Sequence, residues 1–144
     1  MRLVIQRVSH SSVTVDGTVV GKTGPGFLVL VGVGRGDTKA EADRLVRKML
    51  ALRIFEDENG KINRSIRDVG GEILLVSQFT LYADCSHGNR PGFTEAAEPG
   101  KAKELYEYVI EQCRREIPVV EQGIFGADMK VELLNDGPFT IILE

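Results

Sequence analysis

Apolar and polar residues alternate along much of the first third of the chain, as in strands that bury one face. Residues 3–8 follow this pattern, and so do residues 12–21, where Asp16-Gly17 separates two β-branched runs. An Asp-Gly pair in that setting is a strong signal for a hairpin turn. Residues 27–33 are apolar without alternation, which is typical of a strand buried on both faces. These segments predict a strand, a hairpin and a buried strand, in that order.

Two later segments change to the period of an amphipathic helix. In residues 38–50, apolar side chains recur at helical spacing, and Thr38 stands three residues before Glu41 as in a capping box. The second helix begins near Pro99, because proline is favoured in the first helical turn. Its apolar stripe consists of Ala102, Leu105, Tyr106, Val109, Ile110 and Cys113.

The rest of the chain predicts further strands and tight turns. Asn59-Gly60 marks a turn within residues 53–62, and residues 72–82 form an apolar strand that ends in polar residues. Three more strands are predicted at residues 119–125, 129–135 and 139–143. With about eight or nine strands, mostly joined by hairpins, we expect an α+β fold. It would be a mostly antiparallel β-barrel-like sheet with two flanking helices, in one domain of residues 1–144.

Composition narrows the possible function classes. Hydrophobic residues make up 42% and charged residues 27% of the 144 positions, as in an ordinary globular protein. No apolar stretch is long enough to span a bilayer. Arg2 and Arg7 interrupt the apolar run at the N-terminus, so that segment does not resemble a signal peptide. We therefore expect a cytoplasmic protein that has no membrane partner.

Charge and metal-binding residue types narrow the classes further. A net charge of −3 and an isoelectric point of about 5.5 argue against extended, non-specific binding to nucleic acids, which needs many phosphate-neutralising cations. These values still allow the protein to bind one short end of a nucleic acid. Cys85 and Cys113 give no disulfide framework, and the two histidines, His10 and His87, are too few for the spacing of a structural zinc site. We expect no metal and no cofactor.

Two local motifs have both a structural and a chemical interpretation. Residues 32–37 (GVGRGD) follow a strand and precede a helix, where phosphate loops occur, but they lack the full pattern of a nucleotide-binding motif. A tight turn explains them. Cys85, with His87 as its base, would form a nucleophilic pair, but nothing in the sequence supplies the third group that orients such a base. A Gly- and Pro-rich exposed loop explains that segment.

Polar residues at the end of the strand predicted at residues 72–82 form a stronger candidate site. Ser77, Gln78 and Thr80 extend an apolar strand, and buried polar groups without partners cost about 1–3 kcal/mol each. These groups either bond to neighbouring backbone or form a polar site. The final strand starts with Asp136-Gly137-Pro138, in which two turn signals overlap.

The motifs SQFTL (residues 77–81) and NDGPFT (residues 135–140) together resemble those of the D-aminoacyl-tRNA deacylases. These enzymes hydrolyse the ester between a D-amino acid and tRNA and so proofread translation. The resemblance extends over essentially the whole chain and includes LRIFEDENGK (residues 52–61) and RPGFTEAA (residues 90–97). It implies a homodimer of β-barrel-like subunits that bind the acceptor end of D-aminoacyl-tRNA in active sites at the subunit interface.

The resemblance also implies roles for individual residues. Gly137-Pro138 would be a cis peptide inserted into the neighbouring subunit's pocket, where its main-chain atoms exclude an L side chain while a D side chain points away. Arg7 would brace this motif. Phe79 would grip the terminal adenosine, and the N–H groups of Phe79 and Thr80 would stabilise the oxyanion of ester hydrolysis. The resemblance further assigns Ser77 and Gln78 to the catalytic site, and Asn135 and Phe139 to the substrate site.

Several alternatives stay open at this point. Thr80 is a nucleophile, a water-positioning group or a structural residue; because no base is evident nearby, we favour positioning, with water attacking and the 2′-hydroxyl of the substrate assisting. A non-catalytic module that binds a nucleotide or a D-amino acid is a second class of function. An esterase or peptidase that acts through Thr80 or Cys85 is a third. Glycyl-tRNA has no side chain to exclude, so some cleavage of it is expected.

Overall fold

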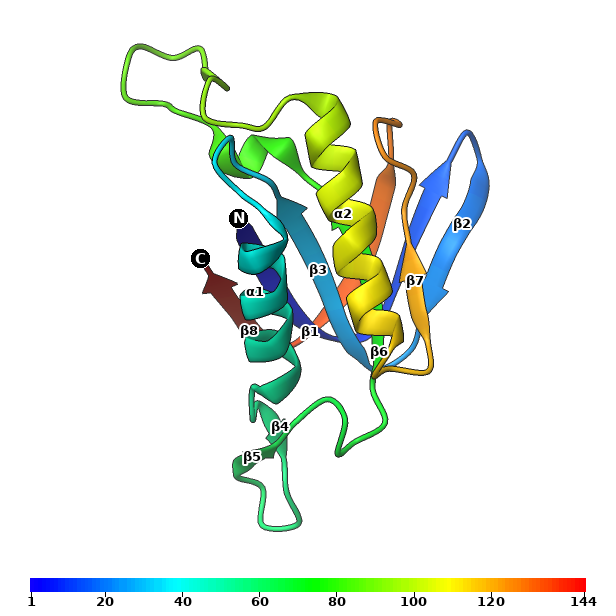
Figure 1. Cartoon of the computed structure of the whole chain (residues 1–144). Coiled ribbons are helices and arrows are strands. Elements are labelled where there is room, and N and C mark those ends of the chain that lie inside the picture. The colour runs from blue at the N-terminus through cyan, green and yellow to red at the C-terminus, as the bar shows by residue number, and fades with distance from the viewer.

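The computed structural model describes residues 1–144 and has one main sheet, two α-helices and a small two-stranded arm (Figure 1). The strands of the main sheet are β1 (Arg2–Val15), β2 (Thr18–Thr23), β3 (Gly26–Gly32), β6 (Glu72–Ser77), β7 (Val120–Gln122) and β8 (Lys130–Leu143). The arm consists of β4 (Phe55–Glu56) and β5 (Ile62–Arg64), and the helices are α1 (Lys39–Ala51), α2 (Pro99–Arg114) and the short 3-10 helix η1 (Phe79–Tyr82). The predicted α+β class is confirmed.

The main sheet has the order β2-β1-β3-β6-β7. Strands β2 and β3 pair with different halves of β1, and β8 pairs with both halves along the opposite side of β1. The pairs of β1 are antiparallel, but β3–β6 and β6–β7 are parallel, so the sheet is mixed and less hairpin-rich than predicted. Parallel neighbours need crossover connections, and the segments containing α1 and α2 provide them. The sheet nearly closes into a barrel, since a Cβ on Gly21 of β2 would lie 2.8 Å from the carbonyl oxygen of Gln122 in β7.

Three predicted boundaries are wrong. The strands expected at residues 3–8 and 12–21 share one continuous strand, β1, because its two halves pair successively with β3 and β2 while β8 pairs along both. The last two predicted strands likewise form the single strand β8. The strand expected to reach Tyr82 ends at Ser77, because the chain curls into η1 directly after the last ladder bond, from Gln78 N–H to the carbonyl of Val31.

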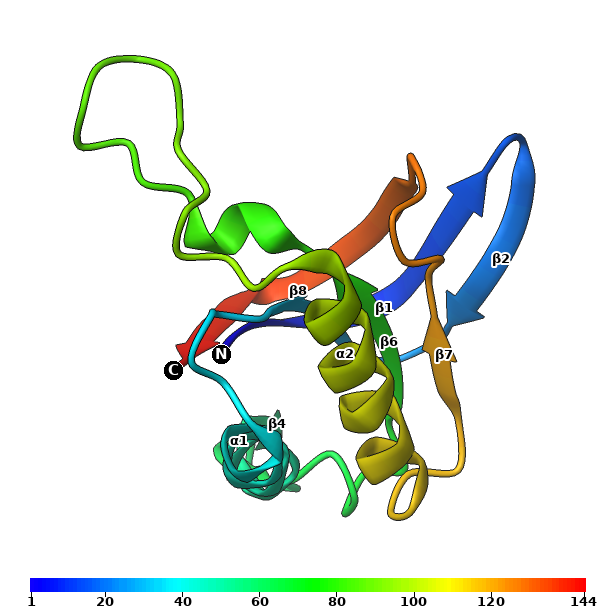
Figure 2. The same cartoon turned by 45° about the horizontal axis from the view of Figure 1, so that its top comes forward.

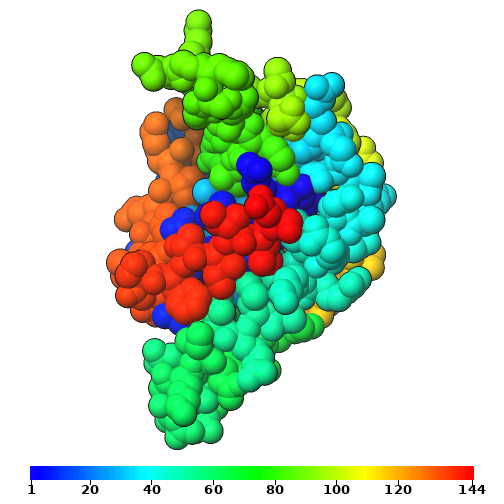
Figure 3. Space-filling model, turned by 90° about the vertical axis from the view of Figure 1, so that its left-hand side faces the viewer, coloured from blue at the N-terminus to red at the C-terminus, as the bar shows by residue number.

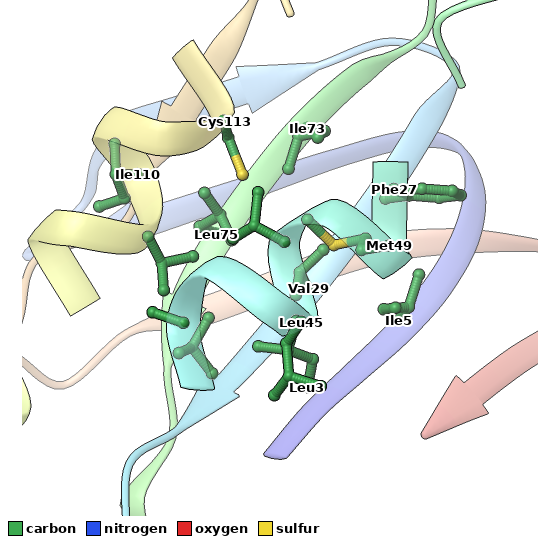
Figure 4. Packing of buried hydrophobic residues seen from close by; sticks show 14 of the residues in the cluster. Leu3, Ile5, Phe27, Val29, Leu45, Met49, Ile73, Leu75, Ile110 and Cys113 are labelled. Carbon is green, nitrogen blue, oxygen red and sulfur yellow. The ribbon is translucent and has the colours of Figure 1, made fainter. Parts of the chain in front are cut away.

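The core is built from the apolar stripes of both helices against one face of the sheet (Figure 4). Leu45 and Met49 of α1 and Cys113 of α2 are among its fully buried side chains. The predicted capping box is present, with the Thr38 hydroxyl accepting from Ala40 N–H and the Glu41 carboxylate accepting from Thr38 N–H. A smaller cluster packs on the other face of the sheet and contains Val8, Val13, Leu28, Leu74 and Val76.

Two segments project from this body (Figures 1 and 2). One is the loop after η1, closed at its base where Asp84 and Gly92 exchange both backbone hydrogen bonds. The other is the β4–β5 arm, whose tight turn is held by the Asp57 carboxylate accepting from Asn59 N–H and Lys61 N–H. Neither α-helix combines the length and the apolar character needed to cross a membrane.

Candidate active site

A pocket of about 560 Å³ opens at the carboxyl ends of β3 and β6, between η1 and the first turn of α2. Most of its lining is apolar, and polar groups enter only from Ser77 and Gln78 at one end. The principal lining side chains are Val31, Val76, Phe79, Phe93, Phe125 and Met129. An apolar pocket with a few polar groups at one end is the usual form of a small-molecule site.

Phe79 forms one wall of the pocket. Its ring is 53% exposed and meets the ring of Phe93 edge to face, with centroids 4.9 Å apart. An exposed ring such as that of Phe79 offers a face on which a flat heterocycle can stack. The hydroxyl of Thr80 accepts a hydrogen bond from Gln78 Nε2 at the rim of the pocket.

The main chain at the start of η1 presents free donors. The N–H groups of Phe79 and Thr80 have no acceptor within the chain, because the first residues of a helical turn lack a preceding carbonyl partner. Both residues are exposed, and Phe79 lines the pocket. Two adjacent N–H groups suit an oxygen atom that gains negative charge during a reaction.

The Gly137-Pro138 motif lies elsewhere, in a bulge of β8. Gln6 pairs with Thr140 and Val8 pairs with Asn135, so residues 136–139 all lie opposite the single residue Arg7. The Gly137-Pro138 peptide bond is cis, as the family resemblance implies, and both residues are exposed.

Arg7 and Asn135 hold this bulge. Arg7 is buried, donates from Nε to the carbonyl of Asp136 at 3.0 Å and from Nη1 to that of Ile54 at 2.7 Å, and lies over the ring of Phe139. The Asn135 carboxamide accepts from Phe139 N–H at 2.6 Å and donates toward Thr140 Oγ1 at 3.1 Å. In this chain Asn135 and Phe139 therefore fix the shape of the bulge.

The other sequence candidates do not form sites. Cys85 and His87 are exposed in the projecting loop and share no hydrogen bond. In residues 32–37, the Asp37 carboxylate pairs with the N-terminal ammonium at 2.5 Å and accepts from Gly34 N–H at 2.6 Å, so a donor that an anion would need is already used. No group of three or more His, Cys, Asp or Glu side chains gathers as metal ligands would.

Two ionisable groups, one in η1 and one just after it, have shifted pKa values. Burial, followed by the negative charge of Asp37, raises the pKa of Tyr82 above its ordinary value. Hydrogen bonds from the hydroxyl and N–H of Ser86 lower the pKa of Asp84. No histidine or carboxylate contributes to the pocket lining, and its polar side chains are those of Ser77 and Gln78.

Residues 4–144 match the family described as D-Tyr-tRNA(Tyr) deacylase. The chain belongs to this family. It is 60% identical over 144 residues to the D-aminoacyl-tRNA deacylase of Ruegeria pomeroyi, covering 100% of this chain and 99% of that relative. It is 54% identical to the D-aminoacyl-tRNA deacylase of Thermosipho melanesiensis, with 100% and 97% covered. The predicted resemblance is confirmed.

Two solved structures share the deacylase fold. One, named c-Myc DNA Unwinding Element Binding Protein, superposes with a TM-score of 0.93 at 44% identity and covers 100% of this chain and 98% of that one. The other, described as a probable eukaryotic D-amino acid tRNA deacylase, has a TM-score of 0.86 at 18% identity and covers 99% and 97%. The second likeness speaks for the fold alone.

The predicted site residues lie in two separate groups in the structure. Ser77, Gln78 and Phe79 line the pocket, with Thr80 at its rim. The second group lines no part of it and gathers at the β8 bulge: Arg7, Asn135, Gly137, Pro138 and Phe139. The two groups do not meet within one chain.

The sequence analysis assigned no role to several side chains that line the pocket. Phe93, Phe125 and Met129 line it from segments far apart in the sequence. RPGFTEAA, which contains Phe93, belonged to the family resemblance, and that was the available signal. Nothing local marks Phe125 or Met129, because only the closure of the sheet brings them to β6.

Proposed function

We propose that this protein hydrolyses the ester bond between a D-amino acid and the 3′ end of tRNA, and that it does so as a homodimer with shared active sites. Family membership over nearly the whole chain is the observation that carries the proposal. The separation of the pocket from the Gly137-Pro138 bulge supports the dimer, because each feature is incomplete alone.

The edge formed by β8 supports this assembly. This strand is 14 residues long and has no neighbour on its outer side, an arrangement that invites pairing with another chain. Leu134 is 53% exposed and Ile142 is 63% exposed along it. Figure 3 shows β8, in red, across the middle of this surface, with the η1 region above it and the arm below.

A two-fold axis near the Val4–Ile142 pair would bring the two groups of residues together. At one end of residues 2–7 of β1, Arg2 donates to the carbonyl of Leu81 in η1, and at the other end of this segment Arg7 holds the bulge. Those ends are about 17 Å apart along an extended strand, with Val4 between them. A two-fold rotation exchanges the ends, so each bulge would reach the partner's Phe79.

The chemistry follows from these parts. The terminal adenine would stack at Phe79 in the apolar pocket. Water would attack the ester carbonyl, and the N–H groups of Phe79 and Thr80 would stabilise the oxyanion. Collapse of this intermediate would expel the ribose 3′-oxygen, which takes a proton, leaving free D-amino acid and tRNA. Thr80, bonded to Gln78, would position the water, assisted by the 2′-hydroxyl of the ribose, since no base is near enough to activate Thr80 as a nucleophile.

Selection for the D form would come from exclusion. Main-chain atoms of Gly137 and Pro138 would occupy the space that an L side chain needs, while a D side chain points out of the pocket. Arg7 and Asn135 keep those atoms in place through four hydrogen bonds to residues of the bulge and its surroundings. Glycine carries no side chain to exclude, so glycyl-tRNA would be cleaved to some extent. Such a role in translation would place the protein in the cytoplasm.

A deacylation time course on matched D- and L-tyrosyl-tRNA tests the function. We expect discrimination beyond about 200-fold, more than a pocket achieves by fitting one extra methylene. D-tyrosyl and D-aspartyl esters of tRNA should both be cleaved, since their side chains would point out of the pocket and make no contact with it. Comparable rates on the two enantiomers would refute exclusion as the basis of selection.

Free D-tyrosine methyl ester separates the remaining alternatives. An esterase acting through Thr80 or Cys85 would cleave it, whereas a deacylase that recognises the adenosine would not. A binding module would cleave neither the ester nor the tRNA. The binding-module alternative is tested as well because one structurally similar protein is named for binding a DNA element.

A further inference from the structure

Three cations on α1 have no partner in the chain. Arg44, Arg47 and Lys48, here called the α1 cation face, are exposed and take part in no ion pair and in no side-chain hydrogen bond. Positions separated by three and four residues lie on the same side of a helix, so their charges repel one another. Like charges at these spacings destabilise the helix slightly unless an anion binds to them.

The neighbouring carboxylates offset part of this positive charge but form no ion pair with the face. Glu41 is occupied by the capping box, and Asp43 accepts a hydrogen bond from the Tyr108 hydroxyl at 2.7 Å. Across the groove between the helices, Glu116 pairs with Arg67, while Arg115 adds a further positive charge beside Arg47. Complementing the helix dipole accounts for Lys48 in the last turn, but Arg44 lies nearer the middle of α1.

The face is also exceptional within the whole chain. Residues 39–67 contain eight basic and five acidic residues, whereas the remaining residues contain ten basic and sixteen acidic ones. The overall charge of −3 therefore conceals one segment with a net charge of +3. Exposed Ala40 and Ala51 flank the cations on the same side of α1, so little side-chain bulk keeps a ligand away.

We propose that the α1 cation face binds backbone phosphates of the acceptor arm of the tRNA. This inference rests on the function proposed above and adds to it a second contact with the substrate, away from the terminal adenosine. Phosphate is the ligand that unpaired Arg and Lys side chains recognise without regard to base sequence. A substrate held at both places would bind more tightly than its last nucleotide alone.

The position of the face fits such a contact. The residues that follow α1 lead to Ile54, whose carbonyl is held by the same Arg7 that holds Asp136 beside Gly137. Helix α1, in cyan and teal, and β8 lie on the same side of the molecule (Figure 3). In the proposed dimer the bulge enters the partner's pocket, so the α1 cation face would flank the pocket that contains the RNA end.

Neutralising variants test the proposal through the salt dependence of catalysis. Two substrates are compared, D-tyrosyl-tRNA and 3′-O-D-tyrosyl adenosine, which has no phosphate. For Arg44→Gln/Arg47→Gln we expect KM for the tRNA to rise about tenfold at physiological salt, and the slope of log kcat/KM against log salt to fall by about 1–2. The kcat for the tRNA and both constants for the adenosine ester should stay near those of the unmutated protein.

Matched variants complete the design. Lys22→Gln/Lys103→Gln removes the same charge from other surfaces and should leave the slope unchanged, whereas Arg44→Lys/Arg47→Lys keeps the charge and should restore it. An unchanged KM and slope in Arg44→Gln/Arg47→Gln, or an equal loss on the adenosine ester, would overturn the proposal. If the unmutated protein cleaves neither substrate, the proposed function itself has failed, which is a different outcome.

Discussion

Arg7 on β1 donates a hydrogen bond from Nε to the carbonyl oxygen of Asp136 on β8, at 3.0 Å. This contact ties the middle of the sheet to the base of the Gly137-Pro138 bulge. The second donor of the same side chain holds Ile54 at the start of the β4–β5 arm. One buried guanidinium therefore fixes the bulge relative to two other parts of the fold.

Replacing Arg7 tests that relationship. Lysine keeps the charge but lacks the fork of donors that reaches two carbonyls at once. We expect Arg7→Lys to lower the free energy of unfolding by about 1.5–3 kcal/mol, the usual cost of losing a hydrogen bond to a charged group. Deacylation of D-tyrosyl-tRNA should fall by more than the unfolded fraction explains. Urea denaturation measures the stability, and initial rates on the same samples measure the activity. Unchanged activity would show that the bulge keeps its shape without the hydrogen bonds of Arg7.

Gly137 tolerates no side chain. Its φ is +145°, and an added Cβ would lie 2.9 Å from Phe139 N and 3.2 Å from Phe139 Cβ. We expect Gly137→Ala to displace the bulge and to abolish most D-specific deacylation while the protein stays folded. Gly60→Ala is the control, because Gly60 also has a positive φ but no atom within 4 Å of the added Cβ. Equal activity in the two variants would contradict a role for the bulge in substrate selection.

A charge at Ile142 should separate the proposed dimer. The side chain is 63% exposed in the single chain and lies beside the proposed two-fold axis. We expect Ile142→Asp to sediment as a folded monomer and to lose activity, because burying an unpaired carboxylate is strongly unfavourable. Val19, which is 56% exposed on the distant β1–β2 hairpin, gives the control Val19→Asp. A fully active Ile142→Asp monomer would rule out shared sites.

The role of Thr80 is open to direct measurement. Its only side-chain partner is Gln78, and no base accompanies it, so we expect Thr80→Ala to keep measurable turnover. No acyl-enzyme should accumulate in the unmutated protein during single-turnover reactions. Intact-protein mass spectrometry of quenched samples detects such an adduct, and a covalent intermediate on Thr80 would make it the nucleophile.

The two cysteines should differ sharply in reactivity. Burial raises the pKa of Cys113 to about 12, so its thiolate is scarce at pH 8, whereas Cys85 is exposed in the projecting loop. A thiol reagent should titrate one group in the native protein and two groups in denaturant. Alkylated Cys85 should leave deacylation of D-tyrosyl-tRNA nearly unchanged, and strong inhibition would revive the cysteine hydrolase alternative.

The sequence alone determined the parts whose signals are local. The periodic apolar stripes and the capping box at Thr38 specify the two helices, and Asp16-Gly17 specifies the hairpin between β1 and β2. The two family motifs around Phe79 and Gly137 specified the candidate site residues other than Arg7, which came from the wider resemblance. Each of these signals depends on neighbours in the chain or on the match of a short motif.

Tertiary structure decided what depends on distant partners. Whether β3 and β6 run parallel, and whether β8 continues through its bulge, follows from backbone pairing that side-chain alternation does not encode. Phe125 reaches the pocket, and Asn135 clamps Phe139, only because the sheet curls and β8 pairs with β1. The sequence supplied the chemical groups, and the folded sheet determined that the pocket and the bulge lie apart in one chain.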